Sequence, residues 1–301
     1  MSKAILAILS VVLLGGAACE KKPAKSTDTG AVNALDRAGS DQGGGAVDTT
    51  PLDGVDVSKL SKDKQDQFYK LIASLTSPCG KAHSLRTSVT TDTSCKRAPF
   101  AVRYVLAFLE DEATEDQIRE FYDKKYKAEG KVKIDVSKAP AVGSEDAPIR
   151  LVEFFDYECP HCQVFKGQLE KVLADRQGKV VVHYMNFPLQ QHHDSKSAAQ
   201  AAVAAHQLGK FHEMHDLLFA KSPAHSHDDV MGYAKEIGLD PTKFEAAYNA
   251  AGAQVAADLA QGEAAGVDST PTLYFNDRKY EGPMYTKYIE LWVDEELAVN
   301  R

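Results

Sequence analysis

Basic runs and bilayer-length apolar segments are both missing from this 301-residue sequence. The net charge is −8, and no cluster of Lys and Arg predicts a nucleic-acid partner. The strongly apolar run at residues 4–14 is shorter than the roughly 20 residues that a transmembrane helix needs. The glycines at 43–45 lack the strand and helix that flank a phosphate-binding loop. What remains is the composition of a globular protein, with 44% hydrophobic and 26% charged residues.

The N-terminal stretch predicts export from the cytoplasm. Lys3 is followed by an uncharged run that ends in the small residues 15–18. This length, together with the positive start and the small residues, is typical of a cleaved signal peptide over residues 1–18. A short membrane anchor is the alternative.

Cysteine is scarce, and its odd count needs an explanation in an exported chain. The five cysteines are Cys19, Cys79, Cys95, Cys159 and Cys162. If the last four form two pairs, Cys19 is left over at the end of the signal. The stretch "GGAAC" resembles a bacterial lipoprotein signal, and this resemblance implies that Cys19 is lipidated and becomes the mature N-terminus. We therefore expect the protein in the periplasm or cell envelope, held at a membrane by a lipid anchor, where disulfides persist.

Composition and periodicity divide the remaining chain. Residues 19–55 are rich in Gly, Ser, Thr and Asp and predict a disordered tether. Residues 56–130 predict a small helical module, with helices in "SKDKQDQFYKLIASL", "APFAVRYVLAFLE" and "TEDQIREFYDKKY". Thr114 and Gln117 have the spacing of a capping box at the start of the third helix.

Cys79 and Cys95 lie within this module. Their wide spacing favours a structural disulfide over a second redox pair. Closing a loop of about 15 residues is worth about 3 kcal/mol in the chain-entropy model. With "SPCGKAHSL", the apolar helix and "TEDQIREFYDKKY", the stretch also resembles the small helical domain of CcmH-like cytochrome c maturation proteins. From this resemblance we expect a helical fold and infer nothing about activity.

Residues 131–301 predict an α/β domain. Strands are expected in "KVKIDV", "IRLVEFFDY" and "KVVVHYMNF", with a helix in "CPHCQVFKGQLEKVLADRQG" between the last two. This β–α–β passage predicts a parallel strand pair. A helical block over residues 194–266, a hairpin in "TPTLYFNDRKYEG" and a closing helix in "TKYIELWVDEELAV" follow.

The Cys159-x-x-Cys162 pair carries the predicted chemistry. Pro160 fits the first turn of a helix, which places Cys159 at the helix N-terminus. There the free N–H groups and the helix dipole stabilise a thiolate, and a protonated His161 adds positive potential. We expect Cys159 to be the nucleophile and Cys162 the resolving thiol. A zinc site has too few nearby ligands, and a bridge across two residues stabilises little.

The segment "LVEFFDYECPHCQVF" resembles the active site of DsbA-like thiol–disulfide oxidoreductases. The resemblance implies a thioredoxin fold over residues 131–301 with a helical insertion, a buried acid at Glu153, and catalytic positions at Pro160 and His161. It also implies a cis-proline at Pro271 in "GVDSTPTLYF", with Thr270 binding an extended client segment. An outward-facing Glu153 and an ordinary trans Pro271 are the alternatives.

These patterns predict an oxidoreductase that exchanges its Cys159–Cys162 disulfide with client cysteines, as an oxidase. Pro-His between the cysteines resembles the oxidising members of the DsbA-like family, which implies that direction, and Thr270 before the proline keeps reductase or isomerase activity open. Expected partners are exported cysteine-containing proteins and a membrane redox partner that resets the pair; no cofactor and no metal is expected. A copper- or zinc-binding module and a non-catalytic interaction protein are the other hypotheses. We interpret the scattered histidines as surface residues: His192, His193, His212, His215, His225 and His227.

Overall fold

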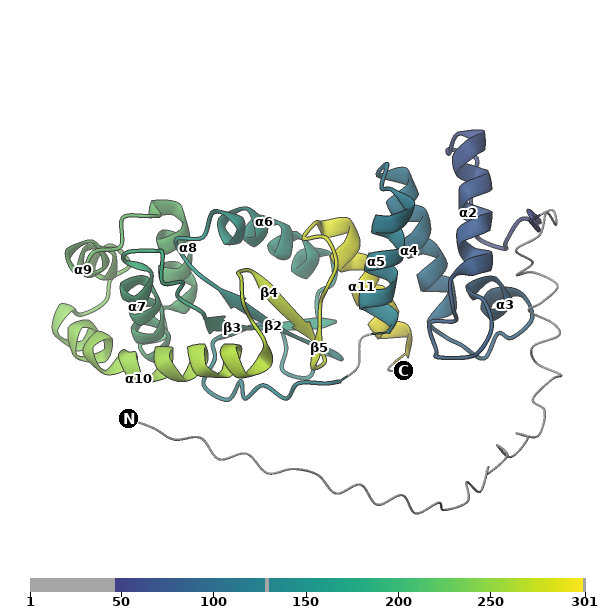
Figure 1. Ribbon diagram of the computed structural model, residues 1–301. Helices are drawn as coiled ribbons and strands as arrows, with labels where there is room; N and C mark the ends of the chain where they lie inside the picture. The colour runs from purple at the N-terminus through teal and green to yellow at the C-terminus, as the bar shows by residue number, and fades with distance from the viewer. Residues whose placement is uncertain (1–46, 128–129, 300–301) are drawn as a thin grey trace, which may run out of the picture.

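The computed structural model describes residues 47–127 and 130–299 (Figure 1). The predicted signal over 1–18, the lipidation site Cys19 and most of the tether lie outside these residues. Residues 47–55 of the tether have no helix or strand, and Arg86 binds Asp48 and the Thr50 carbonyl oxygen. Among the described helices, none combines the length and the apolar character needed to cross a bilayer.

A mixed sheet forms the centre of the C-terminal region, in the order β1-β3-β2-β4-β5. Its strands are β1 (Ala141–Val142), β2 (Ile149–Phe155), β3 (Val180–Asn186), β4 (Thr272–Phe275) and β5 (Arg278–Lys279). Strands β2 and β3 are parallel, and the other pairs are antiparallel. The crossover between β2 and β3 is α6 (Pro160–Asp175), so the predicted β–α–β unit and the α/β class are confirmed.

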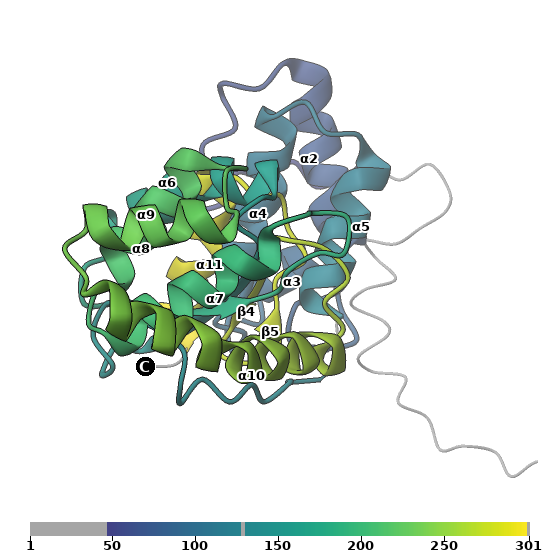
Figure 2. The same cartoon turned by 90° about the vertical axis from the view of Figure 1, so that its left-hand side faces the viewer.

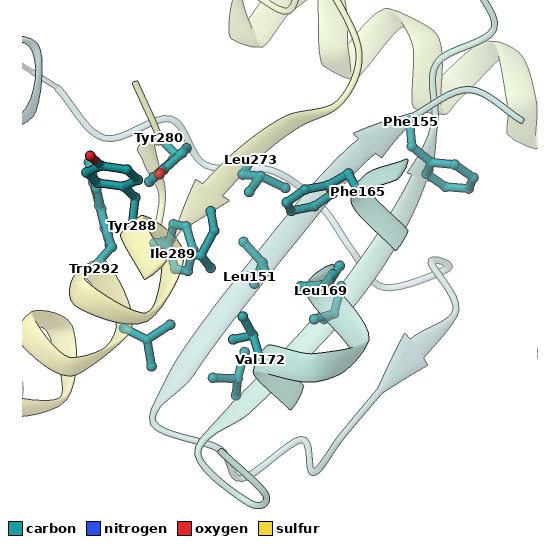
Figure 3. Close-up of a cluster of buried hydrophobic side chains, with 14 of the residues drawn as sticks. Leu151, Phe155, Phe165, Leu169, Val172, Leu273, Tyr280, Tyr288, Ile289 and Trp292 are labelled. Atoms are coloured by element: carbon teal, nitrogen blue, oxygen red, sulfur yellow. The ribbon is translucent and has the colours of Figure 1, made fainter. Parts of the chain in front are cut away.

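Alternation along β2 decides which side chains lie beneath α6. Leu151 and Phe155 pack in the same cluster as the α6 residues Phe165 and Leu169, together with α11 (Thr286–Val299) (Figure 3). Val152 and Phe154 belong to a second cluster on the opposite face of the sheet. Because successive strand side chains point to opposite faces, Glu153 shares the α6 face with Leu151 and Phe155. The sheet therefore carries an acidic side chain into an otherwise apolar layer.

The predicted helical block separates β3 from β4 in the chain. It comprises α7 (Ser195–Gln207), α8 (Phe211–Lys221), α9 (His227–Glu236) and α10 (Pro241–Ala265). These helices gather at one end of the sheet and face the viewer in Figure 2. A small-residue seam of Ala199, Val203, Ala251 and Val255 holds α7 against α10. The block covers the end of the molecule opposite to the N-terminal helices (Figure 1).

Residues 47–127 contain α2 (Lys62–Ser74), α3 (Leu85–Thr90), α4 (Ala98–Glu110) and α5 (Glu115–Tyr126). Three of these helices were predicted, and Thr114 and Gln117 form the predicted capping box on α5. Helix α3 was not predicted, because its sequence LRTSVT is short and holds mostly poor helix formers. The predicted Cys79–Cys95 disulfide is confirmed, with Cα atoms 5.9 Å apart.

The N-terminal helices pack against α11 across a mixed aromatic and ionic interface. The Phe108 ring lies tilted against the Tyr288 ring, with centroids 4.7 Å apart. Lys125 is buried, with its Nζ 3.0 Å from a Glu295 carboxylate oxygen and 3.4 Å from the centre of the Trp292 ring. Side chains from both regions join one hydrophobic cluster. The division at residue 130 remains a prediction, but the described parts on either side of it share a core.

The predicted strand in "KVKIDV" is wrong. Residues 131–136 belong to no strand, and the edge strand β1 lies further along, at residues 141–142. Isolated hydrogen bonds hold the segment instead. Val132 N donates to the Asp277 carbonyl oxygen. The backbone N–H and carbonyl oxygen of Asp135 each form a hydrogen bond with the Gln261 side-chain amide on α10. Ile134 is buried against the sheet. The alternating pattern therefore reports one-sided burial of a segment that lies across the molecule rather than along the sheet.

Candidate active site

Cys159 is the N-cap residue of α6, directly after the loop that leaves β2. Pro160 occupies the first helical turn, where its missing N–H costs no helical hydrogen bond. Both Cys159 and Cys162 are free thiols, with 5% and 0% of their surfaces exposed. An attacking thiolate therefore has access to Cys159 and not to Cys162.

The two thiols differ in acidity although they lie on one helical turn. A hydrogen bond with the Cys162 thiol is the largest influence that lowers the pKa of Cys159, to about 5. The Thr270 side chain and the backbone N–H groups of Cys162 and His161 lower it further. Burial raises the pKa of Cys162 well above its ordinary value. At neutral pH Cys159 is thus a thiolate and Cys162 a thiol, and the backbone N–H of His161 contributes to this difference.

Thr270 and Pro271 lie across from the nucleophile. The Cys159 Sγ is 3.3 Å from the Thr270 carbonyl oxygen. The peptide bond between Thr270 and Pro271 is cis, as the resemblance implied, and β4 begins at the next residue. Residues more than a hundred positions apart in the sequence therefore meet at one sulfur atom.

Glu153 lies beneath the pair, with 3% of its surface exposed. The outward-facing alternative is thus excluded. Desolvation raises the pKa of Glu153 to about 8. Its charge is felt at Cys162, where it helps to raise the thiol pKa. With a pKa of about 8, the Glu153 carboxyl is mostly protonated at neutral pH.

The thioredoxin family model matches residues 135–295. The chain belongs to the thioredoxin family. The oxidised BdbD structure from Bacillus subtilis is 25% identical, covers 56% of this chain and 97% of its own, and superposes with a TM-score of 0.50. A thioredoxin-like oxidoreductase from Silicibacter pomeroyi DSS-3 is 29% identical over 52% of this chain and 91% of its own, with a TM-score of 0.48. The described domain therefore has the thioredoxin fold that the resemblance implied.

Curated relatives match about half of the chain. Na(+)/H(+) antiporter NhaA 3 of Salinispora tropica is 32% identical over 155 residues, which is 50% of this chain and 24% of that protein. Na(+)/H(+) antiporter NhaA of Herminiimonas arsenicoxydans is 34% identical over 145 residues, 46% of this chain and 22% of that protein. The chain thus spans about a quarter of the length of these relatives.

Residues 156–158 of the thioredoxin domain anchor the loop that carries the nucleophile, and sequence reasoning missed them. The Asp156 carboxylate accepts bonds from Leu189 N at 2.7 Å and lies 2.8 Å from His192 Nδ1. The Tyr157 hydroxyl is 3.0 Å from His215 Nδ1 on α8. The two carboxylates flanking Tyr157 were the available sequence signal, since acidic side chains beside a thiolate need neutralising partners.

All six histidines were predicted to be surface residues, and this prediction is wrong for two of them. His215 and His225 are buried, with 6% and 0% of their surfaces exposed. Burial lowers the pKa of His215 to about 3, so this ring is neutral. Within residues 47–127 and 130–299, no group of three or more His, Cys, Asp or Glu side chains is placed to hold a metal ion.

Proposed function

We propose that this protein is a cell-envelope oxidase that transfers its Cys159–Cys162 disulfide to the cysteines of exported proteins. The observation that carries the proposal is the opposite pKa shift of two thiols on one helical turn. A stabilised thiolate favours the reduced pair over the disulfide, which makes the disulfide a strong oxidant. The same thiolate is also a good leaving group.

The proposed reaction has two exchange steps. A client thiolate attacks Sγ of Cys159, forming a mixed disulfide and breaking the Cys159–Cys162 bond. Cys162 leaves with the electron pair and takes a proton from the neutral Glu153 carboxyl. A second client thiolate then attacks the client sulfur of the mixed disulfide, and Cys159 leaves as the stabilised thiolate. The client loses two electrons and gains a disulfide, and the Cys159–Cys162 pair is reduced.

Thr270 and Pro271 are proposed to bind the client beside the nucleophile. An extended client segment can pair with exposed backbone in the manner of an added strand. Reductase or isomerase activity remains the alternative direction for the same site, and it differs in reduction potential rather than in geometry.

The proposed location rests on the N-terminal sequence and on one structural feature. Residues 1–18 and Cys19 have the pattern of a lipoprotein signal, and the Cys79–Cys95 disulfide requires an oxidising compartment. A lipid-anchored protein in the periplasm satisfies both. Such an oxidase also needs a membrane partner that returns the pair to the disulfide.

The test is to mix the oxidised full-length protein with reduced, unfolded ribonuclease. We expect stoichiometric disulfide transfer, recovery of ribonuclease activity and loss of the Cys159–Cys162 disulfide. Equilibration with glutathione then fixes the direction, because a tenfold change in the equilibrium constant is about 30 mV for two electrons. Absence of transfer to any thiol would defeat the proposal, and a potential as low as that of thioredoxin would favour the reductase.

A further inference from the structure

Glu158 and His225 form a buried pair, and Glu158 directly precedes the nucleophile Cys159 in the chain. The two side chains are 6% and 0% exposed, and Glu158 Oε1 lies 3.5 Å from His225 Nδ1. The same carboxylate oxygen accepts a bond of 3.1 Å from Asp194 N at the start of α7, which fixes its position. His225 comes from the loop before α9, so the pair joins the helical block to the residue that precedes Cys159.

The hydrogen bonds of His225 define which nitrogen carries a proton. Nε2 is 2.8 Å from the Leu218 carbonyl oxygen, which only accepts, so Nε2 bears a hydrogen. Nδ1 has no hydrogen-bond partner and lies at ion-pair distance from the Glu158 carboxylate. A neutral ring with this tautomer would aim a lone pair at a buried negative charge. A doubly protonated ring instead places a positive charge against it.

We propose that His225 is a positioning residue that neutralises Glu158 as an imidazolium and thereby preserves the thiolate of Cys159. A carboxylate next to a thiolate disfavours the charged sulfur, because like charges raise the pKa of an acid. With His225 protonated, Glu158 can accept the hydrogen bond from Asp194 N without raising the pKa of the Cys159 thiol. This inference rests on the proposed role of Cys159 and adds a residue that sets the oxidising strength of the pair.

Two substitutions separate the charge from the architecture. His225→Gln retains an N–H donor for the Leu218 carbonyl but carries no positive charge. Glu158→Gln retains an acceptor for Asp194 N but carries no negative charge. Thiolate absorbance of Cys159 against pH, and equilibration with glutathione, report on the chemistry of the sulfur without a client.

We expect His225→Gln to raise the pKa of Cys159 by about half a unit to one unit. The disulfide then becomes about three- to tenfold less oxidising, which is about 15–30 mV. Glu158→Gln should leave the pKa of Cys159 equal to or below the wild-type value. In the double variant, the pKa should return to the Glu158→Gln value, because no carboxylate remains to be neutralised.

His193→Gln is the matched control. His193 also pairs with a carboxylate, Asp194 at 2.8 Å, but its side chain is 94% exposed. We expect no change in the Cys159 pKa or potential in this variant. An NMR measurement of imidazole nitrogens tests the pair without changing His225: both nitrogens should be protonated at neutral pH in wild type, and Nδ1 should lose its proton in Glu158→Gln.

An unprotonated Nδ1 in wild type would overturn the inference, as would a double variant that matches His225→Gln alone. If wild type transfers its disulfide to ribonuclease but the Cys159 thiol has the same pKa in wild type, His225→Gln and Glu158→Gln, only this inference fails. If Cys159 of wild type titrates as an ordinary cysteine, the proposed function falls with it.

Discussion

The two cysteine pairs of this protein lie in two regions and face different surroundings. Cys79 and Cys95, in the N-terminal helices, are separated by 16 positions and closed in a disulfide. Cys159 and Cys162, in the thioredoxin domain, share one helical turn and are free thiols. The first pair constrains a loop of the unfolded chain, whereas the second pair is held over a buried acid. Placement rather than residue type therefore separates a structural pair from a reactive one.

The comparison extends to stability. A disulfide across a long loop stabilises the fold, whereas an ionisable group buried beneath a reactive pair destabilises it once it is charged. The disulfide of the N-terminal region thus raises the free energy of unfolding, whereas the buried acid of the active site lowers it when charged. The predictions below test each half of this contrast.

Cys159→Ser should abolish thiol exchange, with a loss of at least about a thousandfold, because the hydroxyl cannot form a disulfide. The measurement is disulfide transfer from this protein to reduced, unfolded ribonuclease. Cys162→Ser is the informative companion, since it leaves the nucleophile and should accumulate mixed disulfides with clients. Residual exchange in Cys159→Ser would contradict the assignment of Cys159 as the nucleophile, because another thiol would then replace it.

Glu153→Gln should make the thioredoxin domain more stable at high pH. The pKa of Glu153 is raised from 4.5 to about 8, so its contribution to stability is fully present below pH 4.5 and is lost as the pH rises through 8. One pKa unit corresponds to about 1.4 kcal/mol, so the variant should gain several kcal/mol relative to wild type at pH 9 and little at pH 4. Denaturant unfolding of the oxidised proteins at both pH values measures this.

The matched control for that variant is Glu145→Gln, whose side chain is 73% exposed. It should unfold like wild type at both pH values. Glu153→Gln should also slow the release of Cys162 from the active-site disulfide, by about tenfold or more if the carboxyl supplies the proton. A variant that gains stability but exchanges disulfides at the wild-type rate would leave Glu153 without a role in proton transfer.

Local sequence signals predicted much of this molecule, and tertiary contacts account for the misses. The capping box at Thr114 and the helix after Cys159 depend on residues a few positions apart, which the sequence displays directly. The burial of His225 and the course of residues 131–136 depend on partners far along the chain, and alternation alone cannot identify them. The spacing of the cysteines was visible in the sequence, and the resemblance added Glu153 and Thr270. Neither assigned a role to Asp156, Glu158 or their histidine partners.

Replacing both Cys79 and Cys95 with Ser should lower the free energy of unfolding by about 3 kcal/mol. Exchange with ribonuclease should remain at the wild-type rate, since the reactive pair lies in the other region. The double replacement avoids leaving one free thiol that exchanges with clients. A loss of exchange in the folded variant would contradict the purely structural role of this pair.

Thr114→Ala gives the smallest expected effect and asks whether the two regions unfold together. It removes the side-chain oxygen that accepts from Gln117 N at the start of α5, which should cost about 1 kcal/mol. Because Lys125 and Phe108 from the N-terminal helices pack against α11, we expect one transition that shifts as a whole, seen alike by Trp292 fluorescence and by far-ultraviolet circular dichroism. Two separated transitions, with only one shifted by the variant, would show that the shared core does not couple the regions. Thr114→Ser keeps the capping oxygen and should restore the wild-type midpoint.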